Sequence, residues 1–236
     1  MSGPKVTVHW LNNSRSQRIL WLLEELGVEY EVKVYQRDKK TMLAPPELYK
    51  VHPLGKSPVV TIEEPGSAPF VLAESGAIVE TLIERYGNGK LNFSADGPDW
   101  QKRALVTHWI HWAEGSAMLP LMLTIISARI PKEGPWIAKP LTGAVANGLM
   151  TQFALPRLKE NFGYVNDQLA GKDFFVGDQL TGADIMMVFP IEGVDGAGKL
   201  GEFPHIKAWF EKIQQRPAYK RAEEKGGKND MSGFTK

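Results

Sequence analysis

The feature that most restricts the fold of this chain is a change in hydrophobic periodicity at about residue 99. Before that point, apolar residues alternate in short runs, which is typical of strands, and recur at three and four residues in longer segments, which is typical of helices. The order is strand, helix, strand, strand, strand, helix, over residues 5–10, 14–26, 30–34, 58–62, 70–72 and 75–86. The opening strand–helix–strand unit predicts a parallel pair joined by a right-handed crossover.

After residue 99 only helical periodicity remains. The helices are expected over residues 100–129, 142–169, 183–191 and 205–215, and residues 220–236 form a charged, Gly-containing tail that we expect to be mobile. The predicted fold class is therefore α/β followed by all-α. We assign a βαβ-ββα domain to residues 1–88, a linker to 89–98 and an all-helical domain to 99–236.

Composition excludes several classes of function. The formal net charge is +1, so nothing in the charge balance favours nucleic acid as a partner. No apolar run approaches the roughly 18 residues of a membrane span, and the N-terminus lacks a signal-peptide pattern, so we expect a cytoplasmic protein without an integral membrane segment. The chain has no cysteine, which rules out disulfides, a CxxC redox pair and a protein thiol nucleophile.

The segment from Leu54 to Val60 places a proline at the mouth of a β-branched strand. Pro58 is either a trans proline at a sheet edge or part of a cis Ser57–Pro58 bond. In the cis form, the backbone of Ser57 would turn outward and pair with an extended peptide, as an added strand does. Lys56, just before it, is either a solvated lysine or a partner for a ligand carboxylate.

Glu74, Ser75 and Gly76 open the helix that follows the fourth strand. Ser75 is a good N-cap on any interpretation. The same geometry favours a bound carboxylate, because the first N–H groups of a helix are unpaired and lie at the positive end of its dipole. Glu74 would then attract an ammonium group of the same ligand.

Ser14 follows the first strand and is expected to begin the first helix within a capping box. It is either a simple capping serine or a hydroxyl donor to a ligand atom, and Asn13 and Ser16 are alternative donors. Arg15 is the nearest cation in sequence, and a cation there would favour a ligand anion.

The helical half has an aromatic and Met-rich segment between residues 108 and 122. Most such residues are core, and the remainder would line an apolar pocket. We take Trp10, His111, Trp112 and Met118 as candidates for that pocket. His108 and His111 have i,i+3 spacing, but an aromatic seam explains them better than a metal does, and we expect no metal. Residues 181–184 form a capping box that we interpret as structural, with Leu180 as its apolar partner.

These motifs together resemble the cytosolic glutathione transferases. The matching segments are residues 12–16, 52–58, 74–78 and 180–184, whose order and separation match the family across nearly the whole chain. Residues 9–30, 44–48 and 113–116 are most similar to the fungal, yeast-like transferases of the GTT type and to related bacterial proteins.

The resemblance implies a thioredoxin-like first domain with cis Pro58, a homodimer, and glutathione as co-substrate. It implies that Ser57, Glu74 and Ser75 bind glutathione and that His52 and Lys56 lie near its glycyl end. Serine-type members of the family carry their serine at the place of Ser14. No equivalent exists for the tyrosine that other classes use, and the missing cysteine argues against the family's thiol-transfer and reductase chemistry.

The resemblance thus implies an enzyme that activates the glutathione thiolate for attack on hydrophobic electrophiles, with peroxide reduction or ether cleavage as variants. Two alternatives stay open at this point. One is a protein that sequesters hydrophobic compounds without turnover, and the other is a non-catalytic dimerisation module.

Overall fold

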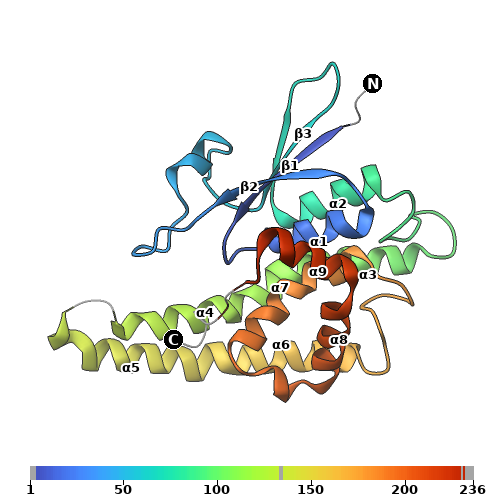
Figure 1. Ribbon diagram of the computed structural model, residues 1–236. Helices are drawn as coiled ribbons and strands as arrows, with labels where there is room; N and C mark the ends of the chain where they lie inside the picture. Colours follow the sequence, from blue (N-terminus) through green and yellow to red (C-terminus); the bar gives the residue numbers. More distant parts are fainter. Residues whose placement is uncertain (1–3, 133–134, 230, 232–236) are drawn as a thin grey trace.

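The first strand lies inside a mixed four-stranded sheet with the order β2-β1-β3-β4 (Figure 1). β1 (Lys5–Leu11) pairs in parallel with β2 (Tyr30–Tyr35) and antiparallel with β3 (Val59–Glu63), which pairs antiparallel with β4 (Phe70–Ala73). The computed structural model from which this is read describes residues 4–132, 135–229 and 231. The predicted parallel pair and strand order along the chain are confirmed.

Two helices of the first domain pack between the sheet and the helical domain. α1 (Gln17–Leu26) ends at Gly27, whose φ of 71° supplies the left-handed conformation that closes the helix. α2 (Ser75–Tyr86) follows β4 directly, and both helices contact α7. The short helical turn predicted after the second strand is the 3₁₀ segment η1 (Pro46–Lys50). This domain has the expected thioredoxin-like arrangement.

The second domain is built from helices, and its described residues contain no β-strand. Its elements are α3 (Trp100–Trp112), the π-helical η2 (Ala113–Ala117), α4 (Met118–Arg129), η3 (Ile130–Lys132), η4 (Trp136–Ala138), α5 (Lys139–Leu149), the π-helical η5 (Met150–Ala154), α6 (Leu155–Gln168), α7 (Gly182–Gly196), η6 (Leu200–Glu202), α8 (Pro204–Gln215) and α9 (Pro217–Gly226). The predicted long helices are present, but each is interrupted by one π turn. Helices α4 and α5 form a long arm that projects from the body (Figure 1).

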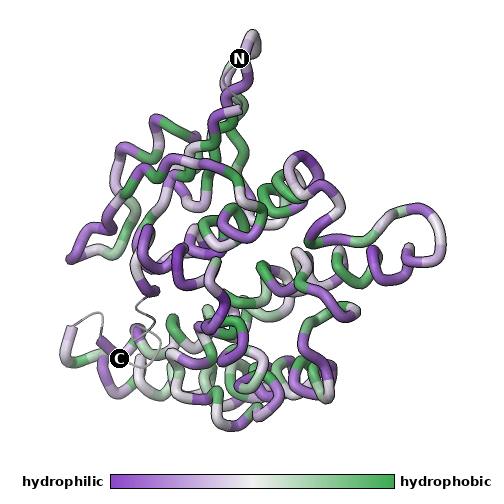
Figure 2. Tube along the Cα trace, turned by 45° about the vertical axis from the view of Figure 1, so that its right-hand side comes forward, coloured by the Kyte–Doolittle hydropathy of each residue, from purple (hydrophilic) through white to green (hydrophobic). Residues whose placement is uncertain are grey.

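Helix α7 packs against both domains, on α1 and α2 of the first and on α3 of the second. Its residues from Gly182 to Val194 are all buried, and hydrophobic segments run through both layers (Figure 2). The predicted capping box is confirmed: Asp184 accepts hydrogen bonds from the backbone N–H and the hydroxyl of Thr181 at 2.9 and 3.0 Å. The Gly182 N–H donates to the carbonyl of Leu91 at 2.9 Å, so this hydrogen bond joins the linker between the domains to the start of α7.

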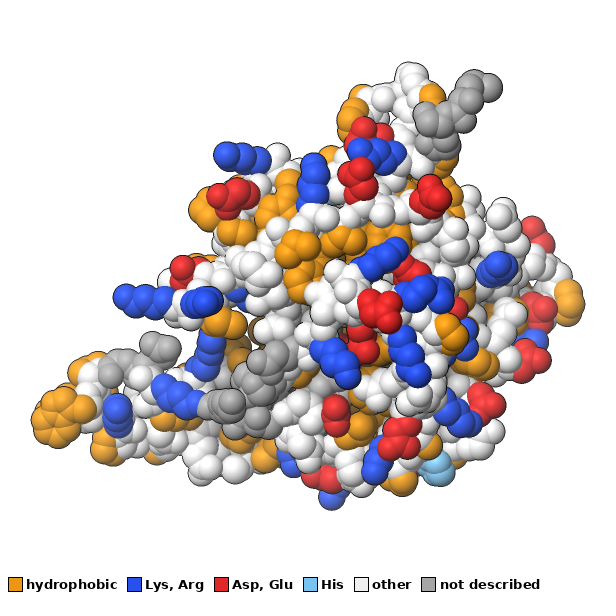
Figure 3. Space-filling model, viewed as in Figure 1, with side chains coloured by type: hydrophobic (Ala, Val, Ile, Leu, Met, Phe, Trp, Pro, Cys, Tyr) orange, Lys and Arg blue, Asp and Glu red, His pale blue; other side chains and the backbone are white. Residues whose placement is uncertain are grey.

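The expectation of a mobile tail from residue 220 is wrong as far as Gly226, because α9 is a helix packed on α1. Glu24 pairs with Arg221 at 2.6 Å and with Lys225 at 2.7 Å. Arg216, the N-cap of α9, forms a two-pronged contact with Glu25. Figure 3 shows the resulting mixture of cations and carboxylates on this face. The prediction for residues 230 and 232–236 lies outside the described residues.

One described helical run, Trp100–Lys132, is long and apolar enough to cross a membrane by length and composition. In its most apolar window 39% of residues are already buried inside the protein. Core helices of soluble proteins pass the same test, so this run is weak evidence for a span.

Candidate functional site

The predicted ligand residues meet in one pocket at the edge of the first domain. The pocket has a volume of about 220 Å³ and is lined by Arg15, His52, Leu54, Lys56, Ser57, Pro58, Ala73, Glu74, Ser75 and Glu114. Six of these residues were predicted from the sequence to bind a ligand. They come from the segment before β3 and from the start of α2, whereas Arg15 comes from the turn after β1 and Glu114 from the helical domain.

The Ser57–Pro58 peptide bond is cis, as the resemblance implied. The Ser57 hydroxyl donates to the carbonyl of His9 at 2.8 Å, which ties this segment to the central strand. Lys56 is exposed beside it, and His52 is half-buried at the same end of the pocket. This end therefore offers two cationic or polar side chains to a ligand.

The start of α2 has a different cap from the one predicted. Glu74, not Ser75, occupies the N-cap position, and its φ is 69°. No side chain among the described residues caps this helix by a hydrogen bond, and Ser75 is buried as its first residue. The first-turn N–H groups lack a side-chain acceptor, and Glu74 and Ser75 line the pocket, so this helix start suits a ligand carboxylate. A non-glycine residue at positive φ is the kind of backbone conformation that collects at functional sites.

Ser14 is not among the residues that line this pocket. Its side chain is buried, and its hydroxyl donates to the carbonyl of Leu11 at 2.7 Å and lies 2.7 Å from the Ser16 hydroxyl. Helix α1 begins at Gln17, with Ser16 as an N-cap that makes no side-chain cap bond. The predicted helix start and capping box at Ser14 are therefore wrong, because both hydroxyls bond back to the strand end instead of to the helix.

The sequence interpretation missed an ion-pair cluster that joins the two domains beside the pocket. The Glu114 carboxylate pairs with Arg15 at 2.9 Å and with the fully buried Arg18. Arg18 also donates to the carbonyl of Met186 at 2.8 Å. Burial alone would raise the pKa of Glu114, but the guanidiniums of Arg18 and Arg15 hold it below its ordinary value. Glu114 is thus an anion that two cations share.

None of the four residues proposed for an apolar pocket lines this cavity. Trp10 is 5% exposed, and its indole N–H donates to Gln17 beneath α9, so its placement at an open pocket is wrong. Trp112 packs edge-on against Trp109 within the bundle, and Met118 is buried at the start of α4. His111 is exposed. The aromatic segment is mainly core, as the general rule for such residues predicts.

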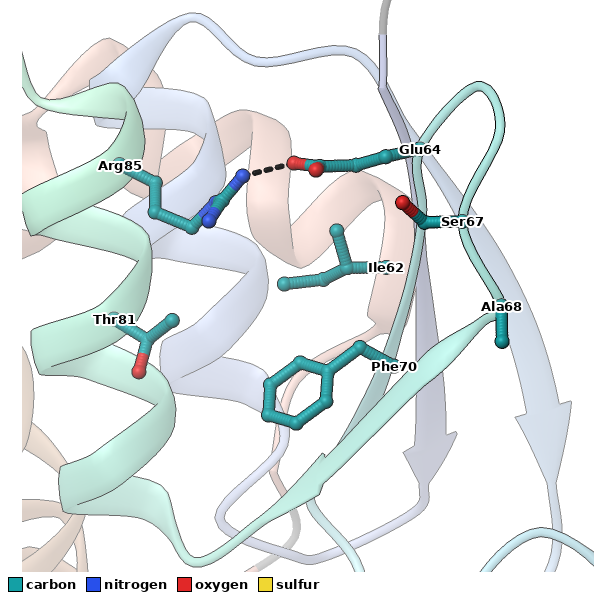
Figure 4. Close-up of a pocket in the computed structure, with 7 residues that line it drawn as sticks. All are labelled: Ile62, Glu64, Ser67, Ala68, Phe70, Thr81 and Arg85. Atoms are coloured by element: carbon teal, nitrogen blue, oxygen red, sulfur yellow. Dashed lines mark hydrogen bonds and ion pairs between the residues drawn. The ribbon is translucent and has the colours of Figure 1, made fainter.

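A smaller cavity of about 140 Å³ lies on another face, between the β3–β4 hairpin and α2 (Figure 4). Its cation, Arg85, is already paired with Glu64, and Phe70 and Thr81 face the space between them. None of the residues predicted to bind a ligand lies there, so the pocket at the start of α2 is the better candidate.

Comparisons with known proteins give a second, independent line of evidence. Residues 6–83 match the sequence profile of the glutathione S-transferase N-terminal domain, and residues 146–217 match that of the C-terminal domain. The chain is 32% identical to glutathione S-transferase 1 of Saccharomyces cerevisiae over 95% of this chain and 97% of that protein. It is 33% identical to glutathione S-transferase 3 of Schizosaccharomyces pombe over 98% of this chain and 91% of that protein.

Solved structures give the same result. The crystal structure of a glutathione S-transferase from Actinobacillus pleuropneumoniae aligns with a TM-score of 0.74 at 32% identity, covering 98% of this chain and all of that one. A glutathione transferase homologue from Lodderomyces elongisporus, described with two glutathione molecules per subunit, aligns with a TM-score of 0.72 at 19% identity, covering 95% and 99%. The second likeness concerns the fold alone.

Proposed function

Because the chain belongs to the glutathione S-transferase family, we propose that it binds glutathione in the pocket at the start of α2 and activates the glutathione thiol for attack on hydrophobic electrophiles. The observation that carries this proposal is the convergence of Lys56, Ser57, Glu74 and Ser75, from separate segments, around one cavity. Peroxide reduction and ether cleavage use the same thiolate and are variants of this activity.

Each end of glutathione has a matching group in the pocket. The first backbone N–H groups of α2 at Ser75 donate to the α-carboxylate of the γ-glutamyl residue, and the Glu74 carboxylate pairs with its ammonium group. Lys56 and His52 meet the glycyl carboxylate at the opposite end. The backbone of Ser57 pairs with the cysteinyl residue between them, as an added strand would.

Ser14 is the proposed hydroxyl donor to the glutathione sulfur. To donate there, it must release the carbonyl of Leu11, and the Ser16 hydroxyl, 3.2 Å from the same carbonyl, can keep that acceptor satisfied. Lowering a thiol pKa by about two units requires about 2.7 kcal/mol of differential stabilisation of the thiolate. A charge-assisted hydrogen bond supplies roughly 1.5–3 kcal/mol, so one hydroxyl accounts for much of that amount.

The test is a titration of the purified protein with glutathione, following thiolate absorbance across pH. We expect a bound thiol pKa well below that of free glutathione, and we expect Ser14→Ala to move it upward. Ser67→Ala, in the exposed β3–β4 turn, is the matched control and should change nothing. Binding with an unshifted pKa would instead indicate a sequestering protein, and no binding would overturn the proposal.

We also propose that the protein is a homodimer and acts in the cytoplasm. The α4–α5 arm carries exposed apolar side chains, with Leu141 at 72% and Leu119 at 61% exposure, and orange side chains gather at its end in Figure 3. Exposed apolar patches of this kind are typical of protein interfaces. Light scattering should give a mass of two chains, and Leu141→Asp should reduce it; a monomeric wild type would contradict the proposal.

A further inference from the structure

Positive charge is concentrated in the segment that runs from β2 to the pocket. Residues 33–56 contain six Lys or Arg residues and two carboxylates, a net charge of +4 in a chain whose net charge is +1. The six cations are Lys33, Arg37, Lys39, Lys40, Lys50 and Lys56. None of them forms an ion pair with a described residue. In Figure 3, Lys and Arg side chains gather at the loop between β2 and η1 (residues 36–45), on the side of the α4–α5 arm.

Arg37, in this loop, makes its hydrogen bonds to neutral acceptors. Its Nε donates to the carbonyl of Asn12 at 3.1 Å, and its Nη1 donates to the carbonyl of Met42 at 3.1 Å. Its Nη2 donates to the carbonyl of Asn13 at 3.5 Å. Burial lowers the pKa of Arg37, as does the nearby Arg15 guanidinium, and an arginine stays charged under both influences. The described residues thus fix the Arg37 guanidinium without neutralising it.

The same contacts place Arg37 beside the proposed position of the glutathione sulfur. Asn12 and Asn13, whose carbonyls it binds, directly precede Ser14, the proposed donor to that sulfur. The electrophile must approach the sulfur from a side that glutathione leaves open. Because the loop is bonded to the turn that carries Ser14, it borders this approach, and its Leu43 side chain is 67% exposed. The loop therefore offers a fixed cation next to apolar surface.

Glutathione itself does not use Arg37 in the proposed binding mode. Its two carboxylates lie at the start of α2 and at Lys56, and Arg37 is not among the residues that line that pocket. A guanidinium has five N–H groups, and three of these bond to described residues, which leaves two for a ligand. A cation in a partly buried site attracts an anion more strongly than a cation in water does. The second substrate is the remaining source of such an anion.

We propose that the electrophile which this protein joins to glutathione carries a carboxylate on an apolar body, and that Arg37 binds this carboxylate. The inference rests on the proposed function and narrows its substrate class. Lys39 and Lys40, on the same loop, raise the local concentration of the anion. In the conjugation step, the thiolate sulfur forms a bond to the electrophilic carbon. The leaving group departs with the electron pair of the bond that breaks, and the thiol proton passes to solvent.

The test compares two acceptors that differ in charge, a chlorodinitrobenzoate and the corresponding chlorodinitrobenzamide. With both, the sulfur displaces chloride from the ring. Each kcat/KM is divided by the rate constant of the same acceptor with glutathione in the absence of protein, which cancels the difference in intrinsic reactivity. We expect the wild type to favour the benzoate, and we expect the benzoate-to-benzamide ratio to fall as salt is added.

Arg37→Gln should lower this ratio about tenfold, mainly through a higher KM for the benzoate, because it removes a charge-assisted hydrogen bond. A residue that only braced the turn before Ser14 would lower both values alike and leave the ratio unchanged. A residue that bound glutathione would raise the KM for glutathione with both acceptors. Either result would overturn the inference. Arg157→Gln, at an exposed arginine on α6, is the matched control and should change neither value.

A second variant covers the case in which Arg37→Gln does not fold. Combined Lys39→Gln and Lys40→Gln removes two exposed cations and leaves the side-chain contacts of Arg37 in place. It should lower the ratio about twofold, as expected for exposed charges. An unchanged ratio in this variant, with a wild-type ratio that does not respond to salt, would contradict the proposal.

Turnover of the benzamide distinguishes failure of this inference from failure of the proposed function. A wild type that conjugates the benzamide without any preference for the benzoate would overturn the inference and leave the proposed function intact. A wild type that conjugates neither acceptor would overturn both.

Discussion

Glu192 is buried inside α7, and its environment favours the protonated form of its carboxyl group. The Tyr219 hydroxyl donates to Oε1 at 2.8 Å and the Asn229 amide donates to Oε2 at 2.7 Å. Burial nevertheless raises the pKa of Glu192 to about 7, and the nearby Glu223 carboxylate adds to the shift, whereas Asn229, Tyr219 and Arg18 oppose it. We therefore expect this single residue to make the free energy of unfolding depend on pH.

Proton binding determines whether the free energy of unfolding rises or falls with pH. In the unfolded chain Glu192 loses its proton near pH 4.5, whereas in the native state it keeps it until about pH 7. Between these values the native state binds more protons, so stability falls as pH rises. The shift corresponds to about 3 kcal/mol, present below pH 4.5 and lost by the time the pH exceeds the folded pKa.

Glu192→Gln removes this dependence because an amide does not titrate. The glutamine carbonyl can accept from Tyr219, and its amide can donate to Oδ1 of Asn229, a buried atom without a hydrogen-bond partner among the described residues. We expect the variant and the wild type to differ little at pH 5. At pH 8 the variant should be the more stable of the two, by an amount approaching 3 kcal/mol.

Urea unfolding at fixed protein concentration measures both free energies, and the comparison at each pH cancels the titration of all other groups. Glu84→Gln, at an exposed position of α2, controls for the loss of a surface charge. The reasoning is refuted if the difference in free energy of unfolding between the Glu192 variant and the wild type is the same at pH 5 and pH 8. It is also refuted if the variant becomes less stable relative to the wild type as pH rises.

Two further predictions concern packing. Gly226→Ala would bring a Cβ atom to 2.8 Å from the indole nitrogen of Trp10. This overpacking should lower the free energy of unfolding by about 1–3 kcal/mol, which a lower Tm would show. An unchanged Tm would mean that α9 can move to make room for the added methyl group. Asp184→Ala would leave the N–H groups of Thr181 and Trp209, now bonded at 2.9 and 3.2 Å, without an acceptor in the core. Denaturant unfolding should show a loss of at least 3 kcal/mol, whereas a loss below 1 kcal/mol would mean that water replaces the carboxylate.

Local patterns in the sequence predicted the elements of the fold and most of the pocket. The helical spacing in α2 reports burial on one side, which is a property of neighbouring residues and therefore readable from a short segment. The alternation in β1 located the strand, although β1 is buried on both faces from Val6 to Leu11. The pocket residues Lys56, Ser57, Glu74 and Ser75 were found because each adjoins a recognisable strand start or helix start. Their convergence follows from the order of the strands in the sheet.

The errors arose where a distant partner decides the structure. Ser14 has the composition of a helix cap, but the carbonyl of Leu11 takes its hydroxyl, and the helix begins three residues later at Gln17. The charged segment that forms α9 resembles a solvated tail unless its counter-charges on α1 are known. Glu24 and Arg221 are separated by 197 residues, and no periodicity records such a pair.

Helix α1 takes part in two contacts that the sequence did not predict, the ion-pair cluster beside the pocket and the contact with α9. Its first turn carries Arg18 and adjoins Arg15, which pair with Glu114 of the helical domain, whereas its last turns carry Glu24 and Glu25, which pair with α9. Ion pairs therefore join both ends of α1 to the helical domain, in addition to its packing on α7 and α9. Since the pocket proposed for glutathione is lined by residues from both domains, any change that loosens α9 from α1 should also loosen Arg15 at the pocket. We therefore expect the proposed binding of glutathione and the docking of the two domains to weaken together.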